Sequence, residues 1–312
     1  MRKHINGILL LDKPLGITSN GALQRMKHLF RAKKAGHTGS LDPMATGMLP
    51  LCFGEATKFS QFLLDSDITY FVTAQLGTCT TTGDREGTIT ATKPVTDISN
   101  ARLDAVLQKF IGEIDQIPPM FSAVKVQGKP LYELARQGIE IERKSRRIKI
   151  YRISSKHYDA EHEHFSFEVH CSKGTYVRTL VEDIGRELGC GAHVADLRRT
   201  RVTPYDGHQI YTFEDLQIIA DTKGQDGLEA CLLPIETSVS GFPGIKLSTA
   251  AAFYLRMGQA VRATLPLHGP LIRLFSEDER FLGVGEATAD GRVKPFRLLS
   301  TTDTAVKTAA AM

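Results

Sequence analysis

The segment Gly36–Pro50, with the sequence GHTGSLDPMATGMLP, is the most informative stretch of the chain. Gly36 and Gly47 bracket a run of small polar residues, and Asp42 stands directly before Pro43, which has no backbone N–H to donate. A turn-forming Asp-Pro pair in a surface loop is the generic explanation. The density of Gly, His, Thr, Ser and Asp ahead of an apolar run instead favours a rigidly seated active loop. The segment has the spacing of neither a P-loop nor a G-x-G-x-x-G loop.

Strands and helices are predicted on both sides of this loop. Upstream, Gly7–Leu11 is an apolar strand that ends at Asp12-Lys13-Pro14, and a helix capped by Ser19 or Asn20 follows it. Downstream, the period-two alternation of Tyr70–Leu76 predicts a strand. The other predicted elements are a short helix over 56–63, helices over 103–110, 177–188 and from Thr212 onward, and a strand over 165–169. The loop is therefore embedded in a domain that mixes helices and strands.

Two regions differ from the rest of the chain in their pattern of residues. Between residues 116 and 147, Pro118-Pro119, Gly128 and Gly138 alternate with basic residues, which predicts a long functional insertion that can cover a ligand. Near residue 241 the pattern changes to a helix around 250–257 and short strands over 271–275, 281–286 and 293–298. The sequence thus divides into a first domain, 1–240, a small β-barrel-like domain, 241–300, and a tail, 301–312, that we expect to be disordered.

The composition is that of an ordinary soluble globular chain. Of 312 residues, 42% are hydrophobic and 24% are charged, which excludes a disordered chain, a collagen-like fibre and a coiled coil. No apolar run approaches the roughly eighteen residues of a membrane span, and none near the start is long enough for a signal peptide. The five cysteines form no C-x-x-C pair and predict reduced thiols. We therefore expect a cytoplasmic protein without a membrane segment.

Positive charge is concentrated in three blocks, although the net charge is only +4. Residues 1–40 contain eight Lys or Arg and one acid, residues 125–156 contain ten and three, and Arg198-Arg199-Thr200-Arg201 is the third block. Each block alone is equally well explained as a solvated surface. Together they favour nucleic acid lying across one face of the protein.

A histidine-rich segment raises the alternative of a metal site. His157, His162, His164 and His170 stand among four acidic residues, and His162 and His164 would share one face of a strand. The segment is acidic and turn-like, and no ligand set elsewhere completes it. A solvated hairpin tip is therefore favoured over a metal centre.

The loop and five further motifs resemble those of the TruB family of transfer RNA pseudouridine synthases. Besides the loop, the matching segments are Gly7–Pro14 (GILLLDKP), Gly54–Lys58 (GEATK), Gln116–Ala123 (QIPPMFSA), Cys171–Thr179 (CSKGTYVRT) and Gly191–Arg199 (GAHVADLRR). These motifs follow the family's order, and the resemblance as a whole covers the chain from about residue 5 to about residue 299. The resemblance implies an α+β fold. Its parts are a large mixed, mainly antiparallel sheet flanked by helices and a small C-terminal PUA-like β-barrel domain that binds RNA.

The resemblance also implies a reaction. Members of the family isomerise uridine to pseudouridine at position 55, in the T loop of transfer RNA, without a metal or an organic cofactor. The base is flipped out, detached from its sugar and rejoined through carbon, with an aspartate as the catalytic carboxylate. A covalent adduct and a glycal intermediate remain alternatives, and an ionised carboxylate suits both. The expected partner is therefore the T stem-loop of transfer RNA, and the expected state is a monomer.

Residue by residue, the resemblance assigns Asp42 as the catalytic carboxylate, Arg178 as its partner and Asp84 as a further acid in that network. Tyr70 matches the tyrosine that stacks on the uracil and serves in proton transfer; on its own, a strand tyrosine is more often a core residue. The remaining matches are substrate-binding residues, namely Tyr176 and Leu197 as walls of the uracil pocket, His37 beside the flipped nucleotide, and Lys13 in the first motif. The chain departs from the family at Thr81, within Thr80-Thr81-Thr82, where Thr-Asp-Thr is frequent.

Two other functions fit parts of the sequence. A non-catalytic RNA-binding or RNA-folding protein would use the basic insertion and the C-terminal domain, but it would need no buried acid. Asp42, Tyr70 and Arg178 together argue against it. A metal-dependent hydrolase would depend on the histidine-rich segment that we interpret as a hairpin tip. The sequence therefore predicts an isomerase that modifies transfer RNA.

Overall fold

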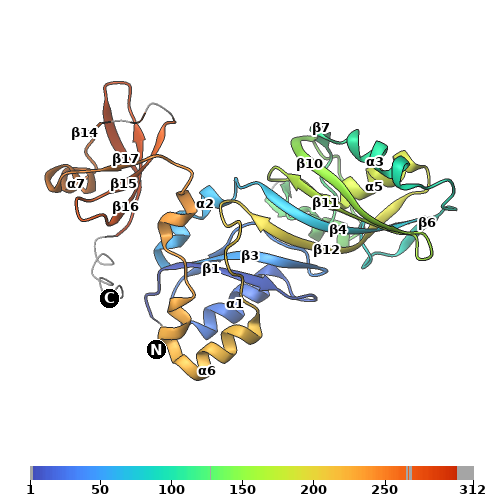
Figure 1. Cartoon of the computed structure of the whole chain (residues 1–312), viewed down its shortest axis with the longest axis horizontal. Coiled ribbons are helices and arrows are strands. Elements are labelled where there is room, and N and C mark those ends of the chain that lie inside the picture. The colour runs from blue at the N-terminus through green and yellow to red at the C-terminus, as the bar shows by residue number, and fades with distance from the viewer. Residues whose placement is uncertain (1–2, 127, 265, 267–268, 301–312) are drawn as a thin grey trace.

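The computed structural model describes residues 3–126, 128–264, 266 and 269–300. The predicted tail, 301–312, lies outside these residues. Within them the chain forms one large mixed sheet with helices and a second, five-stranded sheet near its C-terminal end (Figure 1). This is the α+β architecture that the sequence and the resemblance predict.

The large sheet has eight strands, in the order β1-β3-β12-β4-β11-β10-β7 with β2 paired to β3. Their bounds are β1 (Gly7–Lys13), β2 (Ala35–His37), β3 (Ala45–Phe53), β4 (Ile68–Leu76), β7 (Gly112–Gln116), β10 (Arg146–Asp159), β11 (His164–Cys171) and β12 (Ala192–Val202). Every pairing is antiparallel except that of β12 with β3. The parallel pair sets Leu197 opposite Ala45 and Arg199 opposite Gly47. It therefore brings the end of the Gly36–Pro50 loop beside β12.

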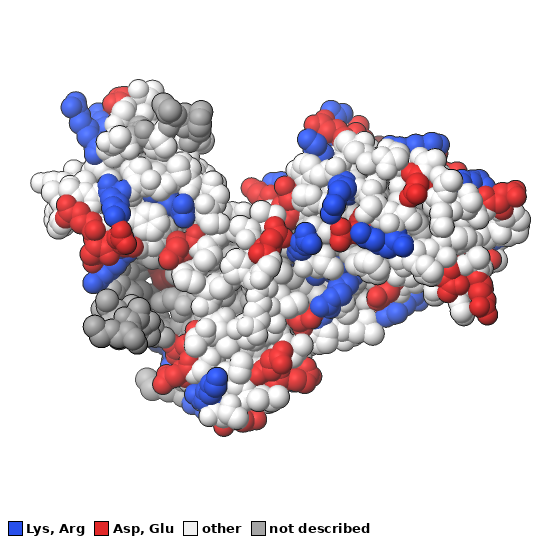
Figure 2. Space-filling view, in the orientation of Figure 1, with Lys and Arg blue, Asp and Glu red and all other residues white. Residues whose placement is uncertain are grey.

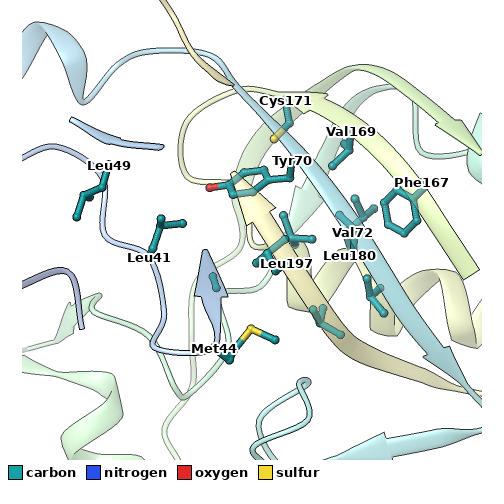
Figure 3. Packing of buried hydrophobic residues seen from close by; sticks show 14 of the residues in the cluster. Leu41, Met44, Leu49, Tyr70, Val72, Phe167, Val169, Cys171, Leu180 and Leu197 are labelled. Carbon is teal, nitrogen blue, oxygen red and sulfur yellow. The ribbon is translucent and has the colours of Figure 1, made fainter. Parts of the chain in front are cut away.

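One face of the sheet carries the main core. In β11 every second residue is fully buried, namely Phe165, Phe167, Val169 and Cys171. Helices α3 (Asn100–Gln108) and α5 (Val177–Leu188) belong to the same apolar cluster. Figure 3 shows Leu180 of α5 beside this face. As predicted, α5 ends at Gly189, whose φ of +85° is the left-handed conformation that favours glycine.

Helix α1 (Ser19–Leu29) covers the β1–β3 end of the sheet (Figure 1). Its N-cap is Thr18, one residue earlier than the predicted caps, Ser19 and Asn20. The buried hydroxyl of Ser19 is used differently, because it hydrogen-bonds the N–H and the carbonyl oxygen of Leu41 at 2.7 and 3.0 Å. The start of α1 is thereby fastened to the loop.

Two further helical predictions have different outcomes. Helix α6 (Phe213–Ala230) begins with the predicted cap, Thr212, in a capping box, and a side-chain hydrogen bond joins α6 to α1. The single helix predicted over 56–63 is divided into a 3₁₀ helix, Gly54–Lys58, and one turn, α2 (Ser60–Leu63).

The segment predicted as an insertion, 116–147, has little regular structure of its own. It contains β8 (Lys125–Val126), β9 (Lys129–Pro130) and the short helix α4 (Leu131–Arg136), and it leads into β10. A second two-stranded sheet is formed by β5 (Thr78–Thr80) and β6 (Ile89–Thr92). The loop between β5 and β6, and the insertion on both sides of the β8–β9 pair, contribute residues to the site described below.

The C-terminal sheet has the strand order β13-β15-β16-β17-β14 and packs with one helix, α7. Their bounds are β13 (Gly244–Lys246), α7 (Thr249–Arg256), β14 (Val261–Arg262), β15 (Leu271–Phe275), β16 (Phe281–Ala287) and β17 (Arg292–Leu298). Aromatic rings join this sheet and the segment before it to the first domain: Phe59 contacts Phe281 of β16 at 5.6 Å, and Phe62 contacts Phe242, ahead of β13, at 5.4 Å between centroids. Figure 2 shows a notch between the C-terminal domain and the lobe that carries β7 and β10.

Candidate active site

Lys13 holds the Gly36–Pro50 loop from behind. Its side chain is fully buried, and its ammonium group donates hydrogen bonds to the carbonyl oxygens of Pro14, Ile17 and Pro43 at 2.9, 2.8 and 3.4 Å. Burial lowers the pKa of Lys13 to about 8. We predicted Lys13 as a substrate-binding residue, but it is not among the residues that line the cavities described below. In the structure, its hydrogen bonds to these backbone carbonyl oxygens hold the loop in place.

Arg199 holds the same loop from the side of β12. Its guanidinium donates to the carbonyl oxygens of Met48 and Gly39 at 2.7 and 2.9 Å, and the residue is 1% exposed. Gly47 has a φ of +103°, and a Cβ at this position would lie 2.2 Å from the Arg199 carbonyl oxygen. A glycine is therefore required at position 47 of the motif.

Two adjoining cavities lie against the loop, and Asp42 and Arg178 line both of them. The smaller, about 300 Å³, is also lined by Tyr70, Tyr176 and Leu197. The larger, about 500 Å³, is also lined by His37, Asp84, Ser122, Tyr132 and Arg136. Seven of the eight predicted site residues thus line one cavity or the other, and Lys13 is the exception.

Asp42 and Arg178 form an ion pair at the wall between the cavities, with 3.0 Å between Oδ2 and Nη2. The Arg178 side chain is 6% exposed, while that of Asp42 is 43% exposed toward solvent. Arg178 also donates to the carbonyl oxygens of Thr82 and Phe121 at 3.0 and 2.7 Å, and its Nη1 lies 3.6 Å from Oδ2 of Asp84. The guanidinium is therefore fixed, and the carboxylate that it holds faces open space.

The charge state of Asp42 is set by opposing effects. Limited access of water raises the pKa of Asp42 above its ordinary value of 3.8, and the nearby Asp84 carboxylate raises it further. The Arg178 guanidinium acts in the opposite direction, because it favours the ionised form, and Lys13 adds a smaller effect of the same sign. Arg178 offsets part of the effect of burial on the carboxylate.

Asp84 is held independently of Asp42. It is 4% exposed, and its Oδ1 accepts hydrogen bonds from the Thr82 hydroxyl at 2.6 Å and from the Glu86 N–H at 3.0 Å. Thr81, where the family often has an acid, lies outside this network. Its hydroxyl accepts from the Thr88 N–H at 3.1 Å and so closes the turn between β5 and β6. The departure at Thr81 leaves the contacts of Asp84 unchanged.

Tyr70 forms part of the floor of the smaller cavity. Its side chain is 8% exposed, and its hydroxyl points away from β4 toward the side where Leu41 and Leu49 of the loop lie (Figure 3). Burial raises the pKa of Tyr70, and the positive charge of Arg199 and a hydrogen bond from it oppose that effect. Leu197 of β12 lies beside the ring in the same view.

Tyr176 is positioned by a residue that sequence reasoning missed. The side chain of Gln116, which is 3% exposed, accepts from the Tyr176 N–H at 2.7 Å and donates to the Tyr176 carbonyl oxygen at 3.0 Å. This pair joins the end of β7 to the start of α5. Gln116 opens the QIPPMFSA motif, so its place in a motif was the available signal.

Two polar groups at the larger cavity lack a protein partner. Nδ1 of His37 and the hydroxyl of Ser122 are buried without a hydrogen bond among the residues that the structure describes. Burial and the charge of Arg199 lower the pKa of His37, which favours the neutral imidazole. Buried polar atoms in native proteins nearly always have partners, so these two atoms are among the exceptions in the described residues.

The third basic block is not the positive surface that we predicted. Arg199 is buried, and Arg198 is bound by both carboxylate oxygens of Asp12 at 2.9 and 2.7 Å. Of the three arginines, Arg201 is exposed and Arg198 is half-buried. In the second block, Arg147 pairs with Asp115, whereas Arg146 is exposed and has no ion pair in the described ranges. Figure 2 shows Lys and Arg mixed with acids on the visible face.

The histidine-rich segment is a hairpin, with His157 in β10, His164 and His170 in β11, and His162 in the turn between them. His162 is exposed there and lies 2.8 Å from Asp159. No group of three or more His, Cys, Asp and Glu side chains in the described part of the chain is arranged to hold a metal ion. No helix there is long and apolar enough to cross a bilayer.

Comparisons with known proteins identify the family. Three family models match consecutive parts of the chain: the TruB family pseudouridylate synthase N-terminal domain over residues 27–177, the tRNA pseudouridylate synthase B C-terminal domain over 178–240, and the pseudouridine synthase II TruB C-terminal model over 243–299. The chain belongs to the TruB family of pseudouridylate synthases. The expected resemblance is confirmed.

Relatives match over nearly the whole chain. The tRNA pseudouridine synthase B of Coxiella burnetii (strain RSA 493 / Nine Mile phase I) is 52% identical over 299 residues, which cover 96% of each chain. That of Pseudomonas fluorescens (strain Pf0-1) is 50% identical over 299 residues, 96% of this chain and 97% of its own. Among solved structures, a chain of a Cbf5-Nop10-Gar1 complex has a TM-score of 0.71 and 26% identity, covering 95% of this chain and 84% of its own. The predicted fold is confirmed.

Proposed function

We propose that this chain isomerises uridine to pseudouridine in transfer RNA, at position 55 of the T loop, with Asp42 as the catalytic carboxylate. The observation that carries the proposal is the ion pair of Asp42 and Arg178 at the wall between two cavities. Relatives named tRNA pseudouridine synthase B, about half of whose residues are identical, support the reaction and the substrate class.

The smaller cavity is suited to a flipped uracil. Its volume of about 300 Å³ and its lining by Tyr70, Tyr176 and Leu197 offer aromatic and apolar walls to a flat base. A base inside a folded RNA loop must leave its stack before a side chain can reach its glycosidic bond. His37, in the adjoining cavity, is placed to contact the RNA beside the flipped nucleotide.

Asp42 acts at the sugar of that nucleotide. The bond from C1′ to N1 of the base breaks, the bond from C1′ to C5 forms, and the proton on C5 is finally replaced by one on N1, so no atom is gained or lost overall. An ionised carboxylate can attack as a nucleophile or stabilise a sugar that becomes positive. Arg178 holds that carboxylate in position and favours its ionised form, and Asp84 stands behind Arg178.

The rest of the chain binds the RNA. We propose that residues 1–240 form the catalytic domain, that the insertion 116–147 contacts the RNA next to the larger cavity, and that the PUA-like domain over 241–300 adds a second contact. Tyr132 and Arg136 of the insertion line the larger cavity and support this assignment. We further propose that the protein works as a cytoplasmic monomer without a metal or an organic cofactor.

A tritium-release assay tests the proposal. A transfer RNA transcript labelled at C5 of its uridines should lose one tritium per molecule, and a transcript with cytidine at position 55 should lose none. Release should persist in excess chelator. No release would leave a non-catalytic RNA-binding protein as the remaining function, and loss of release with chelator would favour a metal-dependent enzyme.

A further inference from the structure

Arg199 is a buried cation without a counter-ion. It is 1% exposed, and no carboxylate in the described part of the chain lies within ion-pair distance of its guanidinium. A buried charge that is not paired with an opposite charge is costly. The cost is offset by hydrogen bonds to the carbonyl oxygens of Gly39 and Met48 at 2.9 and 2.7 Å. Arg199 also lies directly opposite Tyr70 in the pairing of β4 with β12, where its guanidinium contacts the Tyr70 hydroxyl.

The contact with Arg199 determines the direction in which the hydroxyl hydrogen of Tyr70 points. A guanidinium can only donate hydrogen bonds, so the oxygen of Tyr70 must be the acceptor. The hydrogen of that hydroxyl must then point elsewhere, and no protein acceptor for it is present among the described residues. Tyr70 lines the smaller cavity together with Asp42. The free direction is therefore the cavity.

We propose that Arg199 is a positioning residue that orients the Tyr70 hydroxyl as a hydrogen-bond donor toward the substrate in the smaller cavity, while tying it to the loop that carries Asp42. The inference rests on the proposed function, because it needs a base in that cavity. Two motif glycines fit the same role: a Cβ on Gly39 would lie 3.2 Å from Nη1 of Arg199, and one on Gly47 would meet its backbone.

The need for three acceptors explains why the residue is an arginine. Its planar fork can donate to Gly39, Met48 and Tyr70 at once, whereas the ammonium group of a lysine cannot span acceptors in that arrangement. A lysine at position 199 would keep the charge and the apolar stem. We expect the lysine to retain no more than hydrogen bonds to the carbonyl oxygens of Gly39 and Met48. It would no longer orient the Tyr70 hydroxyl.

The first test measures the contact itself and needs no activity. Tyr70→Phe leaves a guanidinium N–H buried without an acceptor, so its unfolding midpoint in urea should fall. Tyr176→Phe is the matched control, because the described residues offer its hydroxyl no partner and its midpoint should not change. An unchanged midpoint for Tyr70→Phe would overturn the proposal.

The second test is a double-mutant cycle on the single-turnover rate at saturating enzyme. We expect Tyr70→Phe and Arg199→Lys each to be at least about tenfold slower than the unaltered protein, with RNA affinity within about twofold. If Arg199 acts through the hydroxyl, the double variant should be no more than about twofold slower than the slower single variant.

The outcomes separate this inference from the proposed function. Losses that multiply in the double variant, or a Tyr70→Phe rate equal to that of the unaltered protein, would reduce Arg199 to a support for the loop. If Arg199→Lys does not fold, the urea midpoint of Tyr70→Phe still decides whether the contact exists. Absence of any conversion by the unaltered protein would instead contradict the proposed function.

Discussion

At the scale of single residues, the site depends on a carboxylate that is costly to ionise. The surroundings raise the pKa of Asp42, and Arg178 opposes part of that rise. The resemblance predicted this pair and Asp84: Asp42 and Arg178 stand in two of the quoted motifs, and Asp84 closely follows Thr80-Thr81-Thr82. Gln116 and Arg199 also stand in quoted motifs, but their supporting roles were not predicted, since a glutamine or an arginine in a strand gives no local sign of burial. Burial is decided by pairing between distant strands, such as that of Arg199 with Gly47.

The pH dependence of the rate tests the charge balance around Asp42. In the proposed reaction Asp42 acts as an ionised carboxylate, so the rate should fall as pH drops through the pKa of Asp42. Asp84 raises that pKa, and Asp84→Asn removes the negative charge while keeping an oxygen acceptor. The acid limb of the single-turnover profile should therefore move to lower pH.

A control variant removes a negative charge at the larger cavity that does not shift the pKa of Asp42. Glu86 also lines the larger cavity, but it is not among the groups that shift the pKa of Asp42. Glu86→Gln should leave the acid limb in place. A shift of the Asp84→Asn limb toward higher pH would contradict the account.

At the scale of elements, the predicted strands and helices were found wherever the pattern was strong. The alternation of Tyr70–Leu76 gave β4, and the apolar spacing before Gly189 gave α5. The errors lie where a distant contact competes with a local signal. Ser19 is a good cap by itself, but its hydroxyl is used by Leu41. The pairing of β12 with β3 also joins residues about 150 apart, which no local pattern reveals.

The close approach of β3 and β12 gives a prediction for Gly47. Gly47→Ala would place a Cβ 2.2 Å from the Arg199 carbonyl oxygen at a φ of +103°. We expect the free energy of unfolding to fall by about 3 kcal/mol or more, from backbone strain and overpacking together. Urea denaturation measures this change.

Gly16 provides the matched control for that substitution. It has a φ of +80°, and a Cβ there would meet nothing within 4 Å. Gly16→Ala should therefore cost only the strain of the left-handed conformation, about 1 kcal/mol. Equal losses of unfolding free energy in Gly47→Ala and Gly16→Ala would show that the close approach of β12 does not restrict the residue at position 47.

At the scale of the whole molecule, the proposed function requires a long polyanion to reach cavities that are lined only by residues before position 200. The notch between the C-terminal domain and the lobe of β7 and β10 is visible in Figure 2. The sequence predicted basic blocks, but Arg147 and Arg198 are paired with acids and Arg199 is buried, so these three arginines add little free positive surface. Net charge could not show this, because pairing depends on which strands become neighbours.

The salt dependence of RNA binding tests which basic residues meet the RNA. Arg146 is exposed without an ion pair in the described ranges, at the end of the insertion. Arg146→Gln should weaken binding and lower the slope of log affinity against log salt by about 1. Arg186 is paired with Asp183, so Arg186→Gln should leave the slope nearly unchanged. An unaltered slope for Arg146→Gln would make that part of the insertion a solvated surface.

The central claim is that Asp42 performs the chemistry while the rest of the molecule binds and positions the RNA. The most direct measurement is the single-turnover conversion of a T stem-loop transcript by Asp42→Asn, with filter-binding affinity determined on the same RNA. The amide keeps the shape of the side chain and removes its negative charge. The account predicts that conversion is abolished while affinity stays within about threefold of the unaltered protein. Near-normal conversion, or a loss of conversion that only follows a loss of binding, would contradict it.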